Sequence, residues 1–277
     1  MKDILVHVDA SPAAHARLSF ALAVAKGFGA RLSALHLTAE PFMRGVSTHA
    51  PADVIDQHVS LANAAADEVL ADMTAQATGQ AVVFRGLKAS GNLDRLPGLL
   101  ARDGRNSDLV IVGQPDPESG GSDDEALVEA AFMETGRPAL VVAHDHVPQF
   151  PFRRVLIAWN ASRQASRAVH DAMPLLKAAE DVVVLVVDPD ALGGVLGRAP
   201  GNGVIQHLAQ HGVVARLRTV DSGRRRAGEV ILTEAVTEGA DLLVMGGYGH
   251  SKLREAFLGG ATRKLLAAAT LPILLSH

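Results

Sequence analysis

The sequence predicts an α/β protein made of two tandem doubly wound domains, each a five-stranded parallel sheet flanked by helices. Two observations predict this fold class. Short runs of Val, Ile and Leu alternate with longer stretches whose apolar residues recur at helical spacing. The short runs are almost uninterrupted, as expected for strands buried on both faces of a parallel sheet. The same order of elements also occurs twice along the chain, which indicates an internal duplication.

Three pairs of matching segments mark the duplication, and they occur in the same order in both halves. The pairs are ILVHVDAS (4–11) with VLIAWNAS (155–162), DLVIVG (108–113) with DLLVMG (241–246), and RPALVV (137–142) with LPILLS (271–276). The first two landmarks are 104 residues apart in the first half and 86 apart in the second. The first half therefore carries about 18 additional residues, which we expect around 41–60. The segment VPQFPFRR (147–154) holds two prolines, which disfavour a continuing helix or central strand, so we expect domains at 1–147 and 152–277.

In the first half, strands and helices are expected to alternate from a first strand to a fifth. The first helix is indicated by Leu18, Ala21, Leu22 and Ala25, which share one helical face. The expected strands are 3–9, 31–37, 81–87, 108–113 and 138–143, and the later helices are expected at about 51–77, 93–103 and 123–135.

The second half repeats this order. The face of its first helix is formed by Ala165, Ala168, Val169, Ala172 and Leu176. The expected strands are 155–160, 181–188, 213–220, 241–246 and 272–276, and the later helices are expected at about 203–211, 227–239 and 260–269. In doubly wound sheets, ligands bind at the carboxyl ends of the strands.

Composition excludes several classes of function. The chain has 277 residues, 48% of them hydrophobic, and a formal charge of −4, so no overall basic field favours nucleic acid. It has no cysteine, which excludes disulfides, thiol catalysis and cysteine-ligated zinc. The start, MKDILVHVDAS, becomes polar too early for a signal peptide, and no apolar run is long enough to span a bilayer. We therefore expect a soluble cytoplasmic protein without nucleic-acid or membrane partners.

One glycine-rich segment, GGYGHSKLREAFLGGATRKLL (246–266), follows an expected strand and leads into an expected helix. Glycines let another molecule approach the main chain closely, and the first N–H groups of a helix attract anions. Lys252, Arg254 and Arg263 would neutralise negative charge, and Thr262 would add a hydroxyl donor. The spacing thus favours a phosphate-binding loop, although a tight turn without a ligand would use the same glycines.

The G-x-x-G pattern, followed by nine residues and another glycine after the fourth strand, resembles the universal stress protein family. An opening strand that ends in D/N-x-S supports the resemblance, which covers nearly the whole chain. It implies binding of ATP or a related adenine nucleotide, which Mg²⁺ could accompany. The positions that match the family's site are Ala158 and Asn160 for adenine at the first strand, Val187 for adenine at the second, and Met245, Gly246, Gly249, Gly259, Gly260 and Ala261 for ribose and phosphates.

Two residues of the second half depart from the family pattern. Asn160 stands where an aspartate is usual, and Gly260 stands where Ser or Thr is usual. The missing hydroxyl removes a hydrogen bond to phosphate worth about 1.5–3 kcal/mol.

The first half departs in the opposite way. Its Asp9 fits the adenine position, but the loop QPDPESGGSDDEAL carries two prolines and acidic residues, among them Asp116, Glu118, Asp123 and Asp124, that oppose phosphate binding. We therefore expect a structural role for the first half.

Three functions follow from these patterns. The leading one is a stress-response protein in which an adenine nucleotide in the C-terminal domain acts as a regulatory switch. The alternative is a stress-response interaction or scaffold protein that binds no nucleotide. The third is at most a slow ATPase, since no residue is an evident base and no catalytic residue is assigned. The family's pairing through the fifth strand implies an intramolecular pseudo-dimer of RPALVV and LPILLS, with further homodimers and protein partners open.

Several other residues have simpler structural explanations. His144 with His146 and His207 with His211 lack a third metal ligand at a readable spacing and are expected on the surface. The run Arg224, Arg225 and Arg226 is expected to be solvated. Trp159 is expected to pack in the core, and Ser11 and Ser162 are expected to cap helices.

Overall fold

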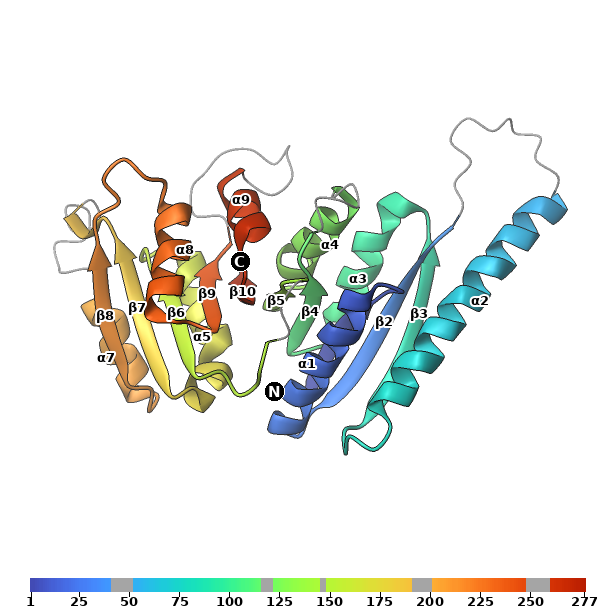
Figure 1. Ribbon diagram of the computed structural model, residues 1–277, viewed down its shortest axis with the longest axis horizontal. Coiled ribbons are helices and arrows are strands. Elements are labelled where there is room, and N and C mark those ends of the chain that lie inside the picture. Colours follow the sequence, from blue (N-terminus) through green and yellow to red (C-terminus); the bar gives the residue numbers. More distant parts are fainter. Residues whose placement is uncertain (41–51, 116–121, 145–147, 191–200, 248–259) are drawn as a thin grey trace.

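The computed structural model describes residues 1–277 except 41–51, 116–121, 145–147, 191–200 and 248–259 (Figure 1). The first half contains β1 (Asp3–Val8), α1 (Pro12–Phe28), β2 (Arg31–Ala39), α2 (Ala52–Ala77), β3 (Phe84–Gly91), a 3-10 turn η1 (Leu93–Arg95), α3 (Leu96–Gly104), β4 (Leu109–Gly113), α4 (Ser122–Met133) and β5 (Ala139–Val142). The second half contains β6 (Arg154–Ala158), α5 (Arg163–Ala178), β7 (Asp181–Val187), α7 (Asn202–Gln210), β8 (Ala215–Val220), α8 (Ala227–Glu238), β9 (Leu242–Gly246), α9 (Gly260–Ala268) and β10 (Ile273–Ser276).

The ten strands that the structure describes form one sheet, in the order β3-β2-β1-β4-β5-β10-β9-β6-β7-β8. Within each half the neighbouring strands are parallel, and the second half repeats the order of the first in reverse. The halves join through β5 and β10, which pair antiparallel with Leu274 opposite Leu140. The predicted fold class and the predicted pairing of the two fifth strands are both confirmed.

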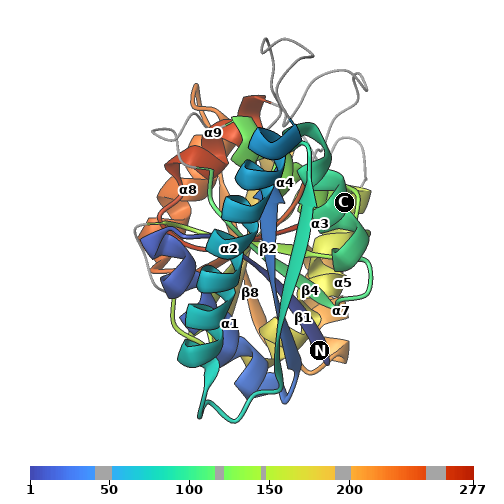
Figure 2. The ribbon, with the colours of Figure 1, turned by 90° about the vertical axis from the view of Figure 1, so that its right-hand side faces the viewer.

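The sheet has an apolar core on each face, and helices cover both (Figure 2). The alternation along β1 shows why, since Ile4 and Val6 enter one core and Leu5 enters the other. The first core receives side chains from α1, α2, α5 and α7, and the second from α3, α4, α8 and α9. Each core draws on both halves, so the two halves share their hydrophobic interior.

The first helix of each half begins as the sequence predicts. The hydroxyl of Ser11 accepts a hydrogen bond from the N–H of Ala14 at 3.2 Å, and that of Ser162 accepts one from Ala165 at 3.1 Å. These bonds satisfy N–H groups that have no partner inside the helix. Both serines are therefore N-caps, as predicted.

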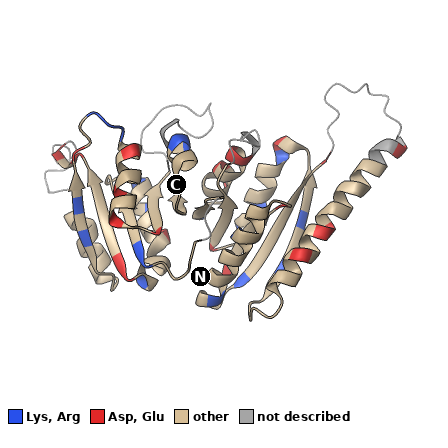
Figure 3. Cartoon of the chain, in the orientation of Figure 1, with Lys and Arg blue, Asp and Glu red and all other residues tan. Residues whose placement is uncertain are grey.

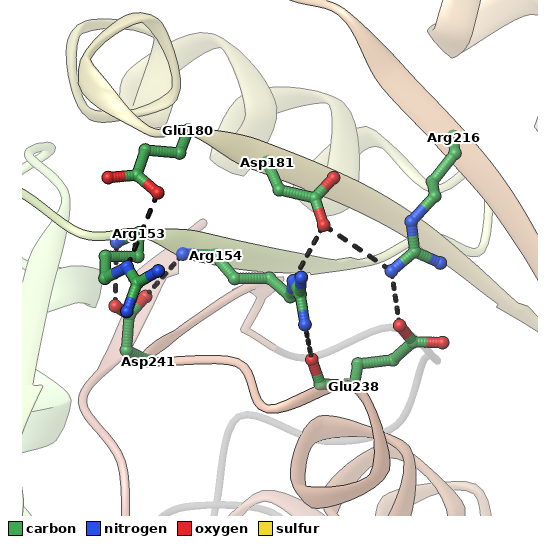
Figure 4. A network of polar contacts seen from close by, with 7 residues as sticks. All are labelled: Arg153, Arg154, Glu180, Asp181, Arg216, Glu238 and Asp241. Atoms are coloured by element: carbon green, nitrogen blue, oxygen red, sulfur yellow. Dashed lines mark hydrogen bonds and ion pairs between the residues drawn. The ribbon is translucent and has the colours of Figure 1, made fainter.

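An aspartate fixes the amino ends of the central strands in each half. The carboxylate of Asp241 accepts hydrogen bonds from the backbone N–H groups of Arg153, at 2.7 Å, and Arg154, at 3.0 Å (Figure 4). Asp108 makes the matching bonds to Lys2, at 2.5 Å, and Asp3, at 3.2 Å, in the first half. The repeat of this contact shows that the duplication extends to individual side chains.

In the second half, Asp241 belongs to a larger ionic network (Figure 4). Arg154 pairs with Asp181 at 2.7 Å and donates to the carbonyl of Glu238 at 2.5 Å. Arg216 bridges the carboxylates of Asp181 and Glu238. The network ties the amino ends of β6, β7 and β8 to the end of α8, and so lies at the opposite edge of the sheet from the carboxyl ends.

The linker between the halves is part of the hydrophobic core. Phe152 is 1% exposed, and its ring centroid lies 5.9 Å from that of Phe20. Phe150 stacks edge-on against Phe152, with 6.0 Å between centroids, and lies 5.4 Å from Phe28. Residues 148–153 form neither helix nor strand, as the prolines predict, and the two phenylalanines anchor the connection on α1.

Two details differ from the sequence-based expectations. The strand expected at 81–87 is β3, which begins at Phe84 and continues to Gly91. It is one of the two edge strands and, among the described strands, pairs with β2 alone, so its position follows its partner and leaves Val83 70% exposed. The additional length of the first half lies mainly in α2, which has 26 residues, whereas α7 has nine.

The long helix α2 carries aspartates and a glutamate but no Lys or Arg (Figure 3). Asp67 on this helix pairs with Lys88 of β3 at 2.6 Å. Within the described ranges, no helix combines the length and apolar character that a bilayer crossing demands.

Candidate functional site

Four apolar side chains line the carboxyl ends of adjacent strands in the second half. They are Ala158 on β6, Val187 on β7, Val220 on β8 and Met245 on β9, and we call them the apolar row. Ala158 pairs with Met245 and Val187 pairs with Val220, so the row crosses four neighbouring strands. All four are only partly buried and pack on the same core. An apolar surface that stays partly open at this edge of the sheet suits the flat face of a heterocycle.

Polar groups follow the strand ends beside the row. Asn160 is exposed, two residues beyond the end of β6, and its Oδ1 accepts a hydrogen bond from the N–H of Ser162 at 3.1 Å. Asp188 follows β7 and accepts a hydrogen bond from the backbone N–H of Ser222 at 2.7 Å. That bond and one from the Ser222 hydroxyl lower the pKa of Asp188 below its ordinary value. Sequence reasoning missed Val220 and Asp188, although both lie at the end of a predicted strand.

The structure gives Gly246 a role in packing. A Cβ atom at this position would lie 2.5 Å from the carbonyl carbon of Gln164 and 2.6 Å from the nitrogen of Ala165. The end of β9 therefore packs directly against the start of α5. Gly246 is not among the glycines with positive φ. What the packing requires at Gly246 is therefore the absence of a side chain.

Backbone donors in the glycine segment are partly engaged. The N–H of Gly247 donates to the carbonyl of Ser276 at 2.8 Å. Gly249 and Gly259, as well as Lys252 and Arg254, lie outside the described residues. Gly260 begins α9, so Gly260, Ala261 and Thr262 lie in its first turn, where backbone N–H groups lack partners within the helix.

Arg263 does not stand free beside this turn, contrary to the expectation. Its guanidinium pairs with the carboxylate of Glu125 on α4 at 2.9 Å. Glu125 belongs to the first half, so the charge expected to neutralise phosphate is neutralised by the other half.

The corresponding place in the first half is filled by its own side chains. The pairing registers match His7 to Ala158 and Leu37 to Val187. The His7 side chain is only 12% exposed. The matching positions on β3 and β4 are Ala89, 7% exposed, and Val112, 1% exposed, so these two are buried where Val220 and Met245 are only partly buried.

Arg17 of α1 engages the polar groups at the end of β1. It is 5% exposed and donates hydrogen bonds to the carbonyl of His7 and to the carboxylate of Asp9, each at 2.8 Å. A Cβ atom at Gly113 would overlap its guanidinium group. Asp9, which matches the adenine position by sequence, is thus already paired with a cation of its own half.

Burial of this cluster shifts its pKa values. Burial, and then the Arg17 guanidinium, lower the pKa of His7 from 6.5 to about 3, although Asp9 acts in the opposite direction. For Asp9, burial raises the pKa, but Arg17 and hydrogen bonds from Ser11 outweigh it and hold the pKa below its ordinary value. His7 is therefore neutral in the folded protein at physiological pH.

This neutral histidine predicts a pH dependence of stability. Below its ordinary pKa, the unfolded chain binds a proton at His7 and the folded protein does not, so stability is complete above that pKa and falls with pH toward the folded value. Protonation of His7 in the unfolded chain should lower the free energy of unfolding by about 2 kcal/mol between about pH 7.5 and about pH 5. We expect this part of the decrease to be absent in His7→Leu. Urea titrations at both pH values measure it. The matched control is His170→Gln, at an exposed position of α5, and equal pH dependence in both variants would contradict the assignment.

The histidines considered as metal ligands do not form a site in the described part of the chain. The rings of His207 and His211 lie 4.6 Å apart, and both residues are exposed. His146 lies outside the described residues. Among the residues that the structure describes, no three His, Cys, Asp or Glu side chains gather in a way that could hold a metal ion.

Comparison with known proteins gives the following matches. The model of the universal stress protein family matches residues 1–134 and 151–277. A universal stress protein from Archaeoglobus fulgidus DSM 4304 has a similar structure, with a TM-score of 0.76 and 17% identity over 99% of this chain and 97% of that one. A protein of Pseudomonas aeruginosa UCBPP-PA14, provisionally described as a universal stress protein, has a TM-score of 0.56 and 17% identity over 100% of this chain and 93% of that one. No curated protein sequence gives a significant match.

Proposed function

The chain belongs to the universal stress protein family, and from this premise we propose that its C-terminal half binds ATP or a related adenine nucleotide as a regulatory ligand. The N-terminal half serves as a structural partner that binds no nucleotide. The single observation that carries the proposal is the difference between the two halves at equivalent positions. Ala158 leaves the apolar row partly open, whereas the larger His7 stands at the same position in the first half and Arg17 pairs with Asp9 beside it.

The described residues fit the base of such a nucleotide. Ala158, Val187 and Met245 offer an apolar surface on which a purine ring can lie. The exposed amide of Asn160 beside them has both a donor and an acceptor, which suits the edge of adenine. An amide carries no charge, so it supports recognition of the neutral base.

The phosphates would be held mainly by backbone groups. The first turn of α9, at Gly260, Ala261 and Thr262, presents N–H groups and the positive end of the helix dipole. The contribution of Gly249 and Gly259 rests on the sequence pattern. A bound Mg²⁺ would be held chiefly by the phosphates themselves, since the described residues supply no cluster of ligands.

In this proposal, nucleotide binding changes the conformation of the protein or its choice of partner. Hydrolysis of the nucleotide is at most a minor activity. A water-activating base should lie close to the reacting phosphate and be positioned by a hydrogen bond. Asp188, the carboxylate next to the apolar row, already accepts from Ser222 and has a lowered pKa, which makes it a weak base.

Calorimetric titration of the whole chain tests this function. We expect micromolar affinity for ATP, weaker binding of adenosine and a stoichiometry of one nucleotide per chain. GTP, which presents a different base edge to Asn160, should bind more weakly. Absence of binding at millimolar ATP would overturn the proposal and leave the scaffold function. A stoichiometry of two would contradict the filled first half.

A further inference from the structure

Helix α9, which begins at the proposed phosphate site, is held at its far end by the N-terminal half. Gln114 follows β4 and is 8% exposed. Its side-chain Nε2 donates hydrogen bonds to the carbonyls of Leu266, at 2.5 Å, and Ala269, at 3.1 Å. Leu266 lies in the last turn of α9 and Ala269 directly follows the helix, where carbonyl groups run out of helical N–H partners; the carbonyl of Leu266 also accepts a bond from the N–H of Ala269 at 3.3 Å. Gln114 is thus a C-terminal cap supplied by the other half.

The near end of α9 is held by α4. Glu125 pairs with Arg263 at 2.9 Å, and its side chain is 19% exposed. Figure 3 shows basic residues on α9 and acidic residues on α4 close to it. Between these two points, Phe132 of α4 packs where a Cβ at Gly247 would overlap its ring. The N-terminal half therefore contacts α9 and the end of β9 at three places.

The arrangement is not reciprocal. The registers match Gln114 to Gly247, and glycine has no side chain with which to cap α4. The N-terminal half thus caps α9 of the C-terminal half, and Gly247 makes no such contact in return.

We infer that Glu125 and Gln114 regulate the nucleotide site of the other half, with Glu125 competing with the ligand's phosphates for Arg263. This inference rests on the proposed function. Arg263 lies one turn into α9, where an anion is favoured by the helix dipole. The ion pair is partly exposed, with Arg263 47% exposed, so it is weak enough to be exchanged. By linkage, nucleotide binding loosens the contact between α4 and α9 by the same factor.

The test compares ATP with adenosine in the whole chain. Glu125→Gln keeps the size of the side chain but removes its charge. We expect it to tighten ATP binding about three- to tenfold and to leave adenosine binding unchanged, because only ATP carries phosphates that compete for Arg263. The matched control is Glu134→Gln, which removes a negative charge from an exposed position just after α4. A general loss of structure would change the affinities for ATP and adenosine alike. Equal changes in the two affinities, no change, or weaker ATP binding would therefore overturn the inference.

Failure of the proposed function is recognised separately, by a wild-type chain that binds neither ligand. The inference is then judged on the unliganded protein by hydrogen exchange. Gln114→Met and Glu125→Gln should each raise exchange in α9 about tenfold, without the same increase in α8. Unchanged exchange in α9 in both variants would overturn the positioning role.

Discussion

Ala158→His is expected to weaken ATP binding by on the order of 100-fold while the chain stays folded, which corresponds to about 2.7 kcal/mol. Histidine stands at the matching position of the first half, His7, where the same strand environment accommodates it. At Ala158 the imidazole would cover the apolar row and occupy the place proposed for adenine. Calorimetry with ATP measures the effect, and circular dichroism shows whether the fold is kept.

The matched control makes the opposite substitution, histidine to alanine, at the matching position of the other half. His7→Ala opens space beside Asp9, but the loop after β4 still lacks the glycine spacing for phosphate, so the stoichiometry should remain one. Undiminished ATP affinity in Ala158→His would place the base elsewhere. A second bound nucleotide in His7→Ala would show that the imidazole alone closes the first half.

Phe152→Ala should lower the free energy of unfolding of the whole chain by about 3–5 kcal/mol. Phe152 is 1% exposed and stacks between Phe20 and Phe150, so truncation leaves a cavity between the linker and α1. Because both halves share each core, we expect a single unfolding transition that moves to lower denaturant concentration.

Urea titration followed by fluorescence and circular dichroism measures this loss. Val214→Ala serves as the control, since Val214 is 90% exposed and its truncation should change stability by less than about 0.5 kcal/mol. If Phe152→Ala cost no more than Val214→Ala, the linker would be a surface connection. Two separate transitions in the wild-type chain would show that the halves unfold independently.

Much of the fold could be predicted because its signals are local. The continuous apolar runs predict the central strands, and the helical face of Leu18, Ala21 and Leu22 predicts α1, since burial on a regular element imposes its period on neighbouring residues. The prediction was weakest at β3. The apolar run that would mark β3 is interrupted, because an edge strand also has exposed positions. The residue at which β3 begins is set by the pairing of Phe84 with Leu32 of β2.

The candidate site could be predicted only in outline. The duplication and the glycine spacing point to the carboxyl ends of β6 and β9, and the structure brings Ala158 and Met245 together there. The pairing of Asp9 with Arg17 in the first half could not be predicted from its sequence. Arg17 lies on a helix and looks like a surface residue, and it is buried only because Gly113 leaves room for its guanidinium.

The sequence by itself determined the order of the elements, the duplication and the family, because these depend on residues close together in the chain. The tertiary structure alone decided that Arg17 pairs with Asp9 and what holds α9. Gln114 and Ala269 are 155 positions apart, and Glu125 meets Arg263 only because β5 and β10 pair across the two halves. Such contacts leave no periodicity in the sequence, since they depend on which strands become neighbours in the folded sheet.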